Sequence, residues 1–160
     1  MHLADMKHAR PFQAIAALVE VLGNDKRVLI RPEGQHYDPT DEAATGHPLT
    51  RSSPALVYAL DDARRIVPVG AVGAAKLDSV YLTVSGHLDA DHETLAAFIP
   101  GLEAGRSVAC VARFWTSRPC QPDPDGIVRL TDWRLTGLLV APEEPIFDEA
   151  RLWLREAVTP

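Results

Sequence analysis

Cysteine, basic charge and long apolar runs are all scarce in this sequence, and each shortage excludes a class of protein. Two cysteines among 160 residues are too few for a disulfide framework, which favours a reduced, cytoplasmic protein. The 22 acidic residues outnumber the 16 basic ones, so a nucleic-acid backbone is not expected as the main partner. No apolar run approaches the ~20 residues that a membrane-spanning helix needs. The N-terminal stretch MHLADMKHAR lacks the apolar region of a secretory signal.

The length and composition are those of one soluble domain. A chain of 160 residues can bury roughly 70% of the surface of its unfolded state, so it needs no metal or disulfide to form a core. We expect a single domain over residues 1–160, in which 1–54 hold a helix, a strand and a long polar loop and 55–160 form a strand-rich core. The loop, Glu33–Pro54, is interrupted by prolines and glycines. A loop of this length is either functional or mobile.

Apolar spacing and capping residues predict three helices. They are Pro11–Leu22, His92–Ile99 and Pro145–Val158. Pro11 suits the first position of its helix and Gly23 suits the C-terminal cap, while Asp91 suits the N-cap of the short internal helix. The last helix carries an apolar stripe formed by Ile146, Ala150, Trp153 and Ala157. Such a stripe predicts that this helix packs on the sheet or on a second copy of the chain.

The remaining periodic segments predict strands. They are Arg27–Arg31, Ala55–Leu60, Arg65–Val72, Ser79–Gly86, Ser107–Trp115, Ile127–Thr131 and Trp133–Ala141. The last of these is the most apolar and is expected to be central. Gly70 and Gly73 predict close strand packing or a bulge, and Asp125–Gly126 predicts a turn. Strands without regular alternation with helices indicate an α+β fold, with a mostly antiparallel, partly closed sheet or barrel and helices at its ends.

Two segments rich in carboxylates are candidate metal sites. The segment GHLDADH contains His87, Asp89, Asp91 and His92. Two histidines and two carboxylates could hold a divalent ion, but their spacing matches no standard zinc motif. Asp123–Gly126 resembles the start of a calcium loop, yet the position that needs a glutamate is Arg134. We therefore expect a strand end with a capped helix in the first segment, a turn in the second, and no metal or cofactor.

Arginines and tryptophans mix on neighbouring predicted strands. They are Arg113, Trp115, Arg118, Arg129, Trp133 and Arg134. Such a face could stack single-stranded bases. A solvated sheet face with two partly buried tryptophans explains the same pattern, and the acidic total disfavours nucleic acid.

Cys110 and Ser107 are the candidate nucleophiles, with His87 or His92 as the base. A lone cysteine in an apolar strand is more often a small buried hydrophobe. The pairing of either nucleophile with a histidine depends on the fold and cannot be read from spacing.

The block from Ala55 to Trp153 resembles the tailed-phage prohead protease family, serine peptidases related to the herpesvirus assemblins. In that family a strand with a catalytic His-Asp precedes a P-I-G-x-V segment, and VPVGAV at Val67–Val72 is similar. The family's strand G-L-x-V-x-G-x-L is matched by VYLTVSGHL at Val80–Leu88. A short helix then leads to its nucleophile strand, S-I-G-F, where this chain has SVACVARF. The closing family strand and Pro-containing turn resemble LTDWRLTGLLVAPEEPIFDEA.

The two catalytic positions of that family hold other residues here. Leu60, followed by Asp61, stands where the family has its His, and alignment on Phe114 puts Val111 at the Ser position, or Cys110 after a shift of one residue. The resemblance therefore implies a relative that kept the barrel and lost the chemistry.

The function expected on this basis is that of a non-enzymatic structural or assembly protein, in a phage head or related particle. Its partner would be itself or another protein. One alternative is an active serine or cysteine peptidase with a displaced site of Cys110 or Ser107 and His87. Another is a binding module that uses the loop over residues 33–54 and the Arg/Trp face.

Overall fold

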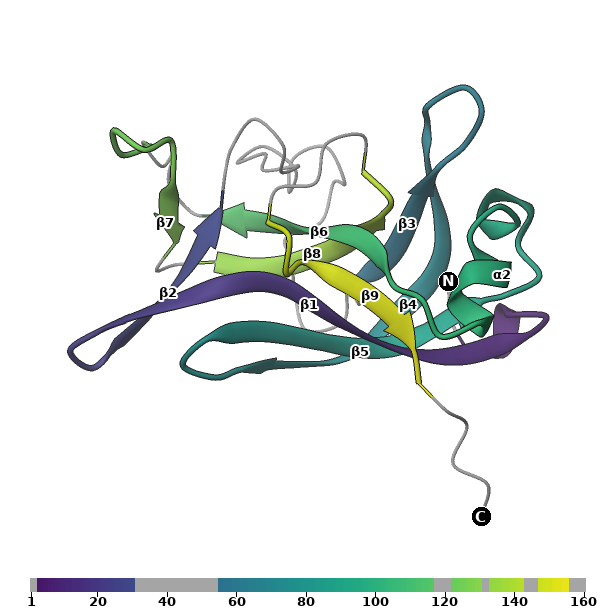
Figure 1. The fold of residues 1–160 in the computed structure, drawn as a ribbon, viewed down its shortest axis with the longest axis horizontal. Coiled ribbons are helices and arrows are strands. Elements are labelled where there is room, and N and C mark those ends of the chain that lie inside the picture. The colour runs from purple at the N-terminus through teal and green to yellow at the C-terminus, as the bar shows by residue number, and fades with distance from the viewer. Residues whose placement is uncertain (1–2, 31–54, 117–121, 131–132, 143–146, 156–160) are drawn as a thin grey trace, which may run out of the picture.

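The chain folds into a closed, seven-stranded barrel with few helices (Figure 1). The computed structural model describes residues 3–30, 55–116, 122–130, 133–142 and 147–155. The strands are β1 (Ala9–Leu22), β2 (Asp25–Ile30), β3 (Leu56–Leu60), β4 (Ile66–Leu77), β5 (Tyr81–Asp89), β6 (Val108–Thr116), β7 (Val128–Leu130), β8 (Trp133–Val140) and β9 (Arg151–Leu154). The helical elements are η1 (Leu3–Asp5), η2 (Glu93–Leu95) and α2 (Ile99–Glu103).

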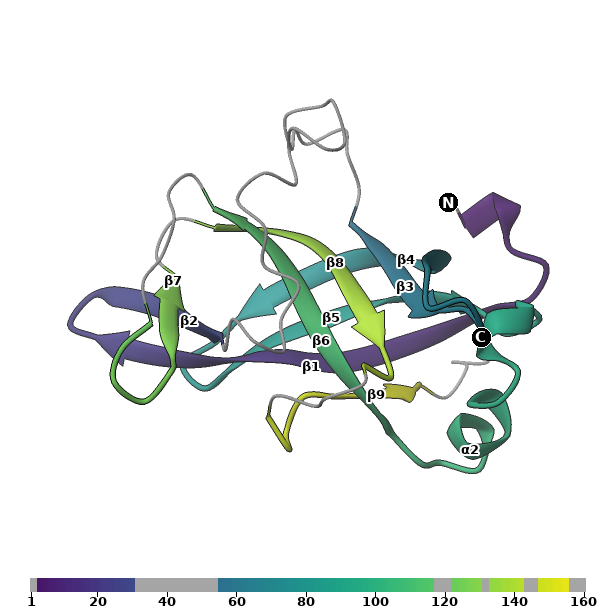
Figure 2. The same cartoon turned by 90° about the horizontal axis from the view of Figure 1, so that it is seen from above.

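The barrel is closed by a continuous circuit of strand pairs. Its order is β5-β4-β3-β8-β6-β9-β1, and β1 also pairs with β5. The β3–β8 pair is parallel, and the other pairs are antiparallel. The predicted strand-rich, mostly antiparallel sheet is thus confirmed, but the barrel is closed where a partly closed one was expected, and the N- and C-terminal helices of the predicted α+β fold are not shown. Beyond the barrel, β2 and β7 extend the sheet from the second half of β1 and form an arm (Figures 1 and 2).

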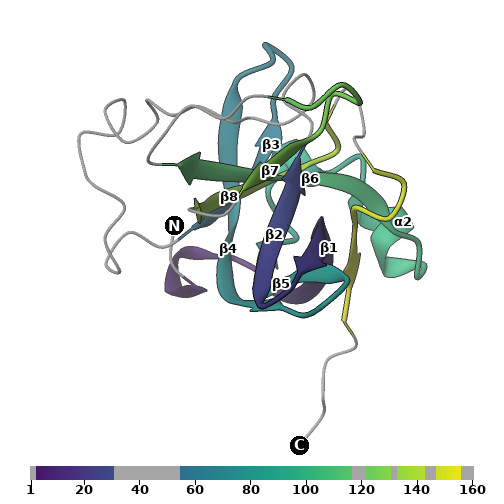
Figure 3. The same ribbon diagram turned by 90° about the vertical axis from the view of Figure 1, so that its left-hand side faces the viewer.

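Apolar side chains from every wall of the barrel fill its interior, around which the strands are arranged in Figure 3. The largest fully buried ones include Phe12, Leu82, Phe114, Leu138 and Leu152. Period-2 alternation explains this, because successive side chains of a strand point to opposite faces. The prediction that the Trp133–Ala141 segment is a central, buried strand is confirmed, since β8 lies between β3 and β6.

The helix predicted over Pro11–Leu22 is wrong, because these residues form most of β1. The burial pattern alternates, but its phase changes at a bulge between Ile15 and Ala17. Ala16 is the extra residue, so Ala16 and Ala17 are both buried. Apolar residues also lie on the outer side of the strand, such as Ile15 and the exposed Leu22, so the segment lacks the strict alternation that predicts a strand. Pairing with β5, β9 and β2 stabilises the strand against local helix propensity.

The capping signals of the predicted helix have other roles. Pro11 lies opposite His87 on β5, and its carbonyl oxygen accepts a hydrogen bond from the Arg155 N–H at 2.9 Å. Gly23 has a φ of 63° and follows Leu22 in a tight turn between β1 and β2. A positive φ at that position serves a hairpin turn as well as a helix cap, so the residue alone could not separate the two.

The helix predicted over Pro145–Val158 is also wrong in the part that the structure describes, residues 147–155. Here the chain forms β9, which pairs with β6 and β1. Leu152 is buried, and Leu154 packs against the same core. Trp153, expected to anchor a helix, pairs with Gln13 and is half-buried. Without β9, these edges of β6 and β1 would have unpaired backbone N–H and C=O groups, and pairing with them stabilises residues 151–154 as a strand.

The smaller elements agree more closely with the prediction. The internal helix predicted over His92–Ile99 is only partly right. This range holds the short 3-10 turn η2, whose N-cap is His92 and not Asp91, and the α-helix α2 begins only at Ile99. Gly70 packs so closely that an added Cβ would clash with the carbonyl oxygen of His87, and Gly73 lies at a bulge in β4. The turn before β7 is held by Asp123 and contains Gly126 with a φ of 78°. Among the described residues, no helix is long and apolar enough to cross a membrane.

We predict that Leu152→Ala destabilises the barrel by about 2–5 kcal/mol, because it leaves a cavity where β9 meets the core. The Leu152 side chain has 0% exposure, whereas Leu3 is 53% exposed. The same substitution at Leu3 is therefore the matched control and should change stability by less than about 0.5 kcal/mol. Urea unfolding of both variants measures this, and equal losses would show that β9 is a loose tail.

Candidate functional site

Cys110, the first candidate nucleophile, points into the barrel. Its thiol donates a hydrogen bond to the carbonyl oxygen of Ile15, at 3.5 Å, beside the bulge in β1. Burial raises the pKa of Cys110 to about 12, although Arg151 acts in the opposite direction. Since the thiolate is the nucleophile, this neutral, water-excluded thiol is not prepared for attack.

Ser107, the second candidate, contacts a cation instead of a base. Arg151 Nε donates to Ser107 Oγ at 2.6 Å, and Arg151 Nη2 donates to the Ser107 carbonyl oxygen at 2.9 Å. A guanidinium cannot accept the hydroxyl proton. The contact joins the start of β6 to β9 and gives Ser107 a structural role.

The candidate bases lie elsewhere. His87 is on β5, between Ala71 of β4 and Pro11 of β1, whereas β6 has β8 and β9 as neighbours. His92 Nδ1 accepts a hydrogen bond from the Thr94 N–H at 3.2 Å and caps η2. Among the residues that the structure describes, neither Cys110 nor Ser107 is therefore hydrogen-bonded to a histidine.

The two positions that the family resemblance singled out share one outer face of the barrel. Val111 pairs with Leu139, which pairs with Tyr58, and Leu60 follows Tyr58 on the same side of β3. Val57 and Ala59, between them, point into the core. Val111 and Leu139 are 1% and 0% exposed. We call the outer side of β3, β8 and β6 the apolar face.

Asp61, next to Leu60, is used by the turn between β3 and β4. Its carboxylate accepts hydrogen bonds from the Arg65 N–H at 2.8 Å and from Arg65 Nε at 3.1 Å. The backbone N–H of Arg65 is the main reason that the pKa of Asp61 is held below its usual range. Arg64, inside this turn, has a φ of 62°. Asp61 therefore lies beside the apolar face, but its carboxylate is already hydrogen-bonded within the turn.

The segment GHLDADH is also structural. Asp89 is buried and accepts hydrogen bonds from the backbone N–H groups of His8, at 3.2 Å, and Asp91, at 3.1 Å. His8 Nδ1 lies 3.7 Å from an Asp91 carboxylate oxygen. Among the described residues, no group of three or more His, Cys, Asp or Glu side chains could hold a metal ion.

The described residues of the Arg/Trp face are not all on one surface. Trp133 packs against Phe114 of the core, with ring centroids 5.4 Å apart and an interplanar angle of 84°. Arg113 lies over the Tyr58 ring at 5.6 Å. Arg134 is exposed. Arg118, the side chain of Trp115 and the predicted loop over residues 33–54 lie outside what the structure describes.

Arg129 belongs instead to an ion triad that holds the arm. Its Nε donates to Glu20 Oε1 at 2.9 Å, and its Nη1 donates to Asp123 Oδ2. These contacts join β1, β7 and the turn that precedes β7. The pKa of Asp123 is held below its usual range, first by the hydrogen bond from Arg129 and then by the N–H of Ile127.

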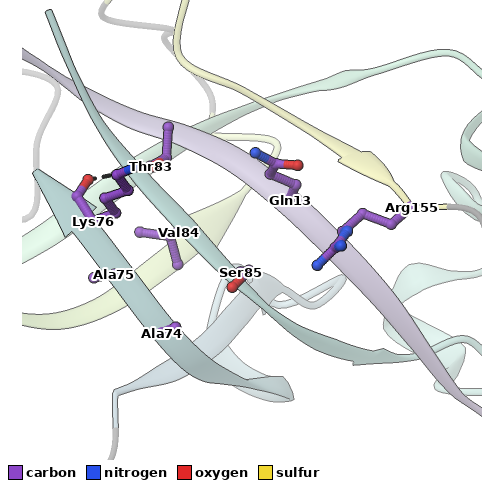
Figure 4. Close-up of a pocket in the computed structure, with 8 residues that line it drawn as sticks. All are labelled: Gln13, Ala74, Ala75, Lys76, Thr83, Val84, Ser85 and Arg155. Carbon is purple, nitrogen blue, oxygen red and sulfur yellow. Dashed lines mark hydrogen bonds between the residues drawn. The ribbon is translucent and has the colours of Figure 1, made fainter. Parts of the chain in front are cut away.

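A second outer surface was not predicted. The outer side of β4, β5 and β1 is hollowed into an open groove of about 250 Å³ (Figure 4). Its lining residues are Gln13, Ala74, Ala75, Lys76, Thr83, Val84, Ser85 and Arg155. The polar alternation of Thr83 and Ser85 on β5 was visible in the sequence. That three strands and Arg155 come together at one groove follows only from the fold of the barrel, so it could not be predicted from the sequence.

Comparison of the chain with protein-family models, curated proteins and solved structures found no match. Inference about its activity therefore depends on the geometry of these two outer surfaces and on the resemblance of its sequence segments.

We predict that Asp123→Asn lowers the melting temperature at about pH 6 and that this loss shrinks towards about pH 2.5. The folded pKa of Asp123 lies below the unfolded value of about 4. Its charge therefore stabilises the protein above that value, and the contribution is lost as the pH falls through the folded pKa.

The matched control is Asp125→Asn, which removes an exposed carboxylate from the same turn. It should leave the pH dependence of melting close to that of the parent. A loss for Asp123→Asn that is constant from about pH 2.5 to 6 would contradict the role of its charge.

Proposed function

We propose that this chain is a non-enzymatic structural or assembly protein with a prohead-protease-like barrel, acting in a phage head or related particle. The observation that carries the proposal is the apolar face. Leu60 and Val111, at the positions of the family's His and Ser, lie on that one face with Leu139 between their strands. Hydrocarbon side chains can neither transfer a proton nor attack a carbonyl.

The surroundings of these positions support the same conclusion. Cys110, the alternative at the nucleophile position, is turned into the core with its pKa raised to about 12. Ser107 is held by Arg151. A displaced peptidase site would need one of them within hydrogen-bond reach of a histidine, and no such bond occurs in the described part of the chain.

A closed barrel suits a role in assembly. Closure pairs the sheet edges of the seven barrel strands, so the barrel itself offers little template for aggregation. A rigid body with distinct outer surfaces can be placed in a larger structure without refolding. We propose that the partner is a second copy of the chain or another protein of the same particle.

We predict that the native protein has no peptidase activity and no reactive nucleophile. In a Cys120→Ser background, iodoacetamide should label Cys110 only after denaturation, because burial and the raised pKa suppress the thiolate. A fluorophosphonate should leave Ser107 unlabelled. Mass spectrometry of digests measures both, with Cys110→Ala/Cys120→Ser as the blank. Native labelling accompanied by casein cleavage that is lost in His87→Ala would overturn the proposal.

A further inference from the structure

We propose that the groove on the outer side of β4, β5 and β1 binds an extended acidic segment of a partner protein. Two cationic side chains stand on opposite sides of it, Lys76 from β4 and Arg155 just after β9 (Figure 4). Ser85 and Gln13 lie between them. The backbone of Arg155 is fixed by its hydrogen bond to the Pro11 carbonyl oxygen, at 2.9 Å, so its position is part of the barrel.

Both cations are available to a ligand. Within the described residues, neither Lys76 nor Arg155 forms an ion pair or a side-chain hydrogen bond. Asp78, the carboxylate that follows β4, accepts hydrogen bonds from the backbone N–H groups of Val80 and Tyr81, each at 2.7 Å. It also attracts Lys76 and Lys26 through space, but among the described residues it forms no hydrogen bond or ion pair with either. Lys26 reaches the Leu77 carbonyl oxygen at 3.5 Å and adds positive charge near this end of the groove. The charge around the groove is therefore opposite in sign to the net charge of the chain, which is -6.

The floor of the groove can accommodate a peptide backbone. Ala74, Ser85 and Gln13 are partners in register on adjacent strands, so they form one row across the outer surface. The alanine leaves space, while the hydroxyl and the amide can each donate and accept hydrogen bonds. Trp153 pairs with Gln13 and extends the row with an aromatic ring. This row offers the mixture of polar and aromatic groups that protein partners use.

The size of the groove indicates the class of ligand. Small-molecule sites enclose ≈ 300–1,000 Å³, whereas this groove is open and holds about 250 Å³. It therefore suits side chains presented by a macromolecule. In an extended segment, alternate side chains share one face and are spaced about 7 Å apart. Two carboxylates at such positions could each approach one cation. A nucleic acid would need a longer row of cations and would meet the repulsion of an acidic chain.

The proposed site deepens the proposed function by giving the chemistry of one partner, and it rests on that function only for its biological setting. The proposed binding site and the proposed function can be disproved independently of each other. Peptide binding is measured at the groove, while peptidase activity is measured at Cys110, Ser107 and the apolar face.

The test uses a capped hexapeptide of alternating glutamate and serine, titrated into the ¹⁵N-labelled full chain. We expect amide shifts confined to β4, β5 and β1 and an affinity that falls as salt is added. The double variant Lys76→Gln/Arg155→Gln should weaken binding at least about tenfold. The control Arg106→Gln removes one exposed cation elsewhere and should change the affinity less than about twofold.

Three results would overturn the proposal. The first is equal binding of a glutamine–serine hexapeptide, which would remove the role of charge. The second is a loss in Arg106→Gln as large as in the double variant, which would indicate non-specific attraction. The third is tighter binding of an oligothymidylate of equal length, which would assign the groove to nucleic acid.

Discussion

Backbone pairing of β1 with three other strands is the constraint on which the rest of this structure depends. One edge of its first half pairs with β5, and the other edge pairs with β9. Its second half pairs with β2 and so begins the arm. A strand of 14 residues is about 45 Å long, which is enough for both tasks. The bulge between Ile15 and Ala17 separates them, and the Cys110 thiol satisfies the carbonyl oxygen of Ile15 there.

Two groups of side chains of opposite character point outward from the barrel; Val111 and Leu139 of the first are buried, whereas Lys76 and Arg155 of the second are exposed. The apolar face carries Leu60 and Val111 where the resembled family has reactive groups, with Leu139 on the strand between them. The groove across β4, β5 and β1 carries Lys76 and Arg155. Among the described residues, neither group includes an acid–base pair, and both lie on strands whose inner side chains are packed in the core. A closed sheet holds such side chains rigidly in place.

The sequence predicted the strands better than the ends of the chain. Alternation in Ser79–Gly86 and the apolar run in Trp133–Ala141 depend on local pattern, and both segments form strands of the barrel. The segments Pro11–Leu22 and Pro145–Val158 were misread, because their pairing partners are distant in sequence and local propensity favours a helix. The bulge at Ala16 interrupts the alternation of inward-pointing and outward-pointing residues along β1, so the strand could not be recognised from its pattern. The separation of Cys110 from His87, and the existence of the groove, depend on which strands are neighbours, and no spacing in the sequence contains that information.

The position of β9 in the chain has a consequence for how this protein is made. Phe12 pairs with Leu154, so the contact that completes the circuit joins residues separated by nearly the whole sequence. Loop closure over such a distance makes folding slow compared with that of proteins dominated by local contacts. During synthesis the edges of β1 and β6 stay open until β9 has left the ribosome. A nascent or truncated chain would expose those edges to other chains. The period before closure is thus the time at which this protein is most vulnerable to aggregation and most in need of a chaperone.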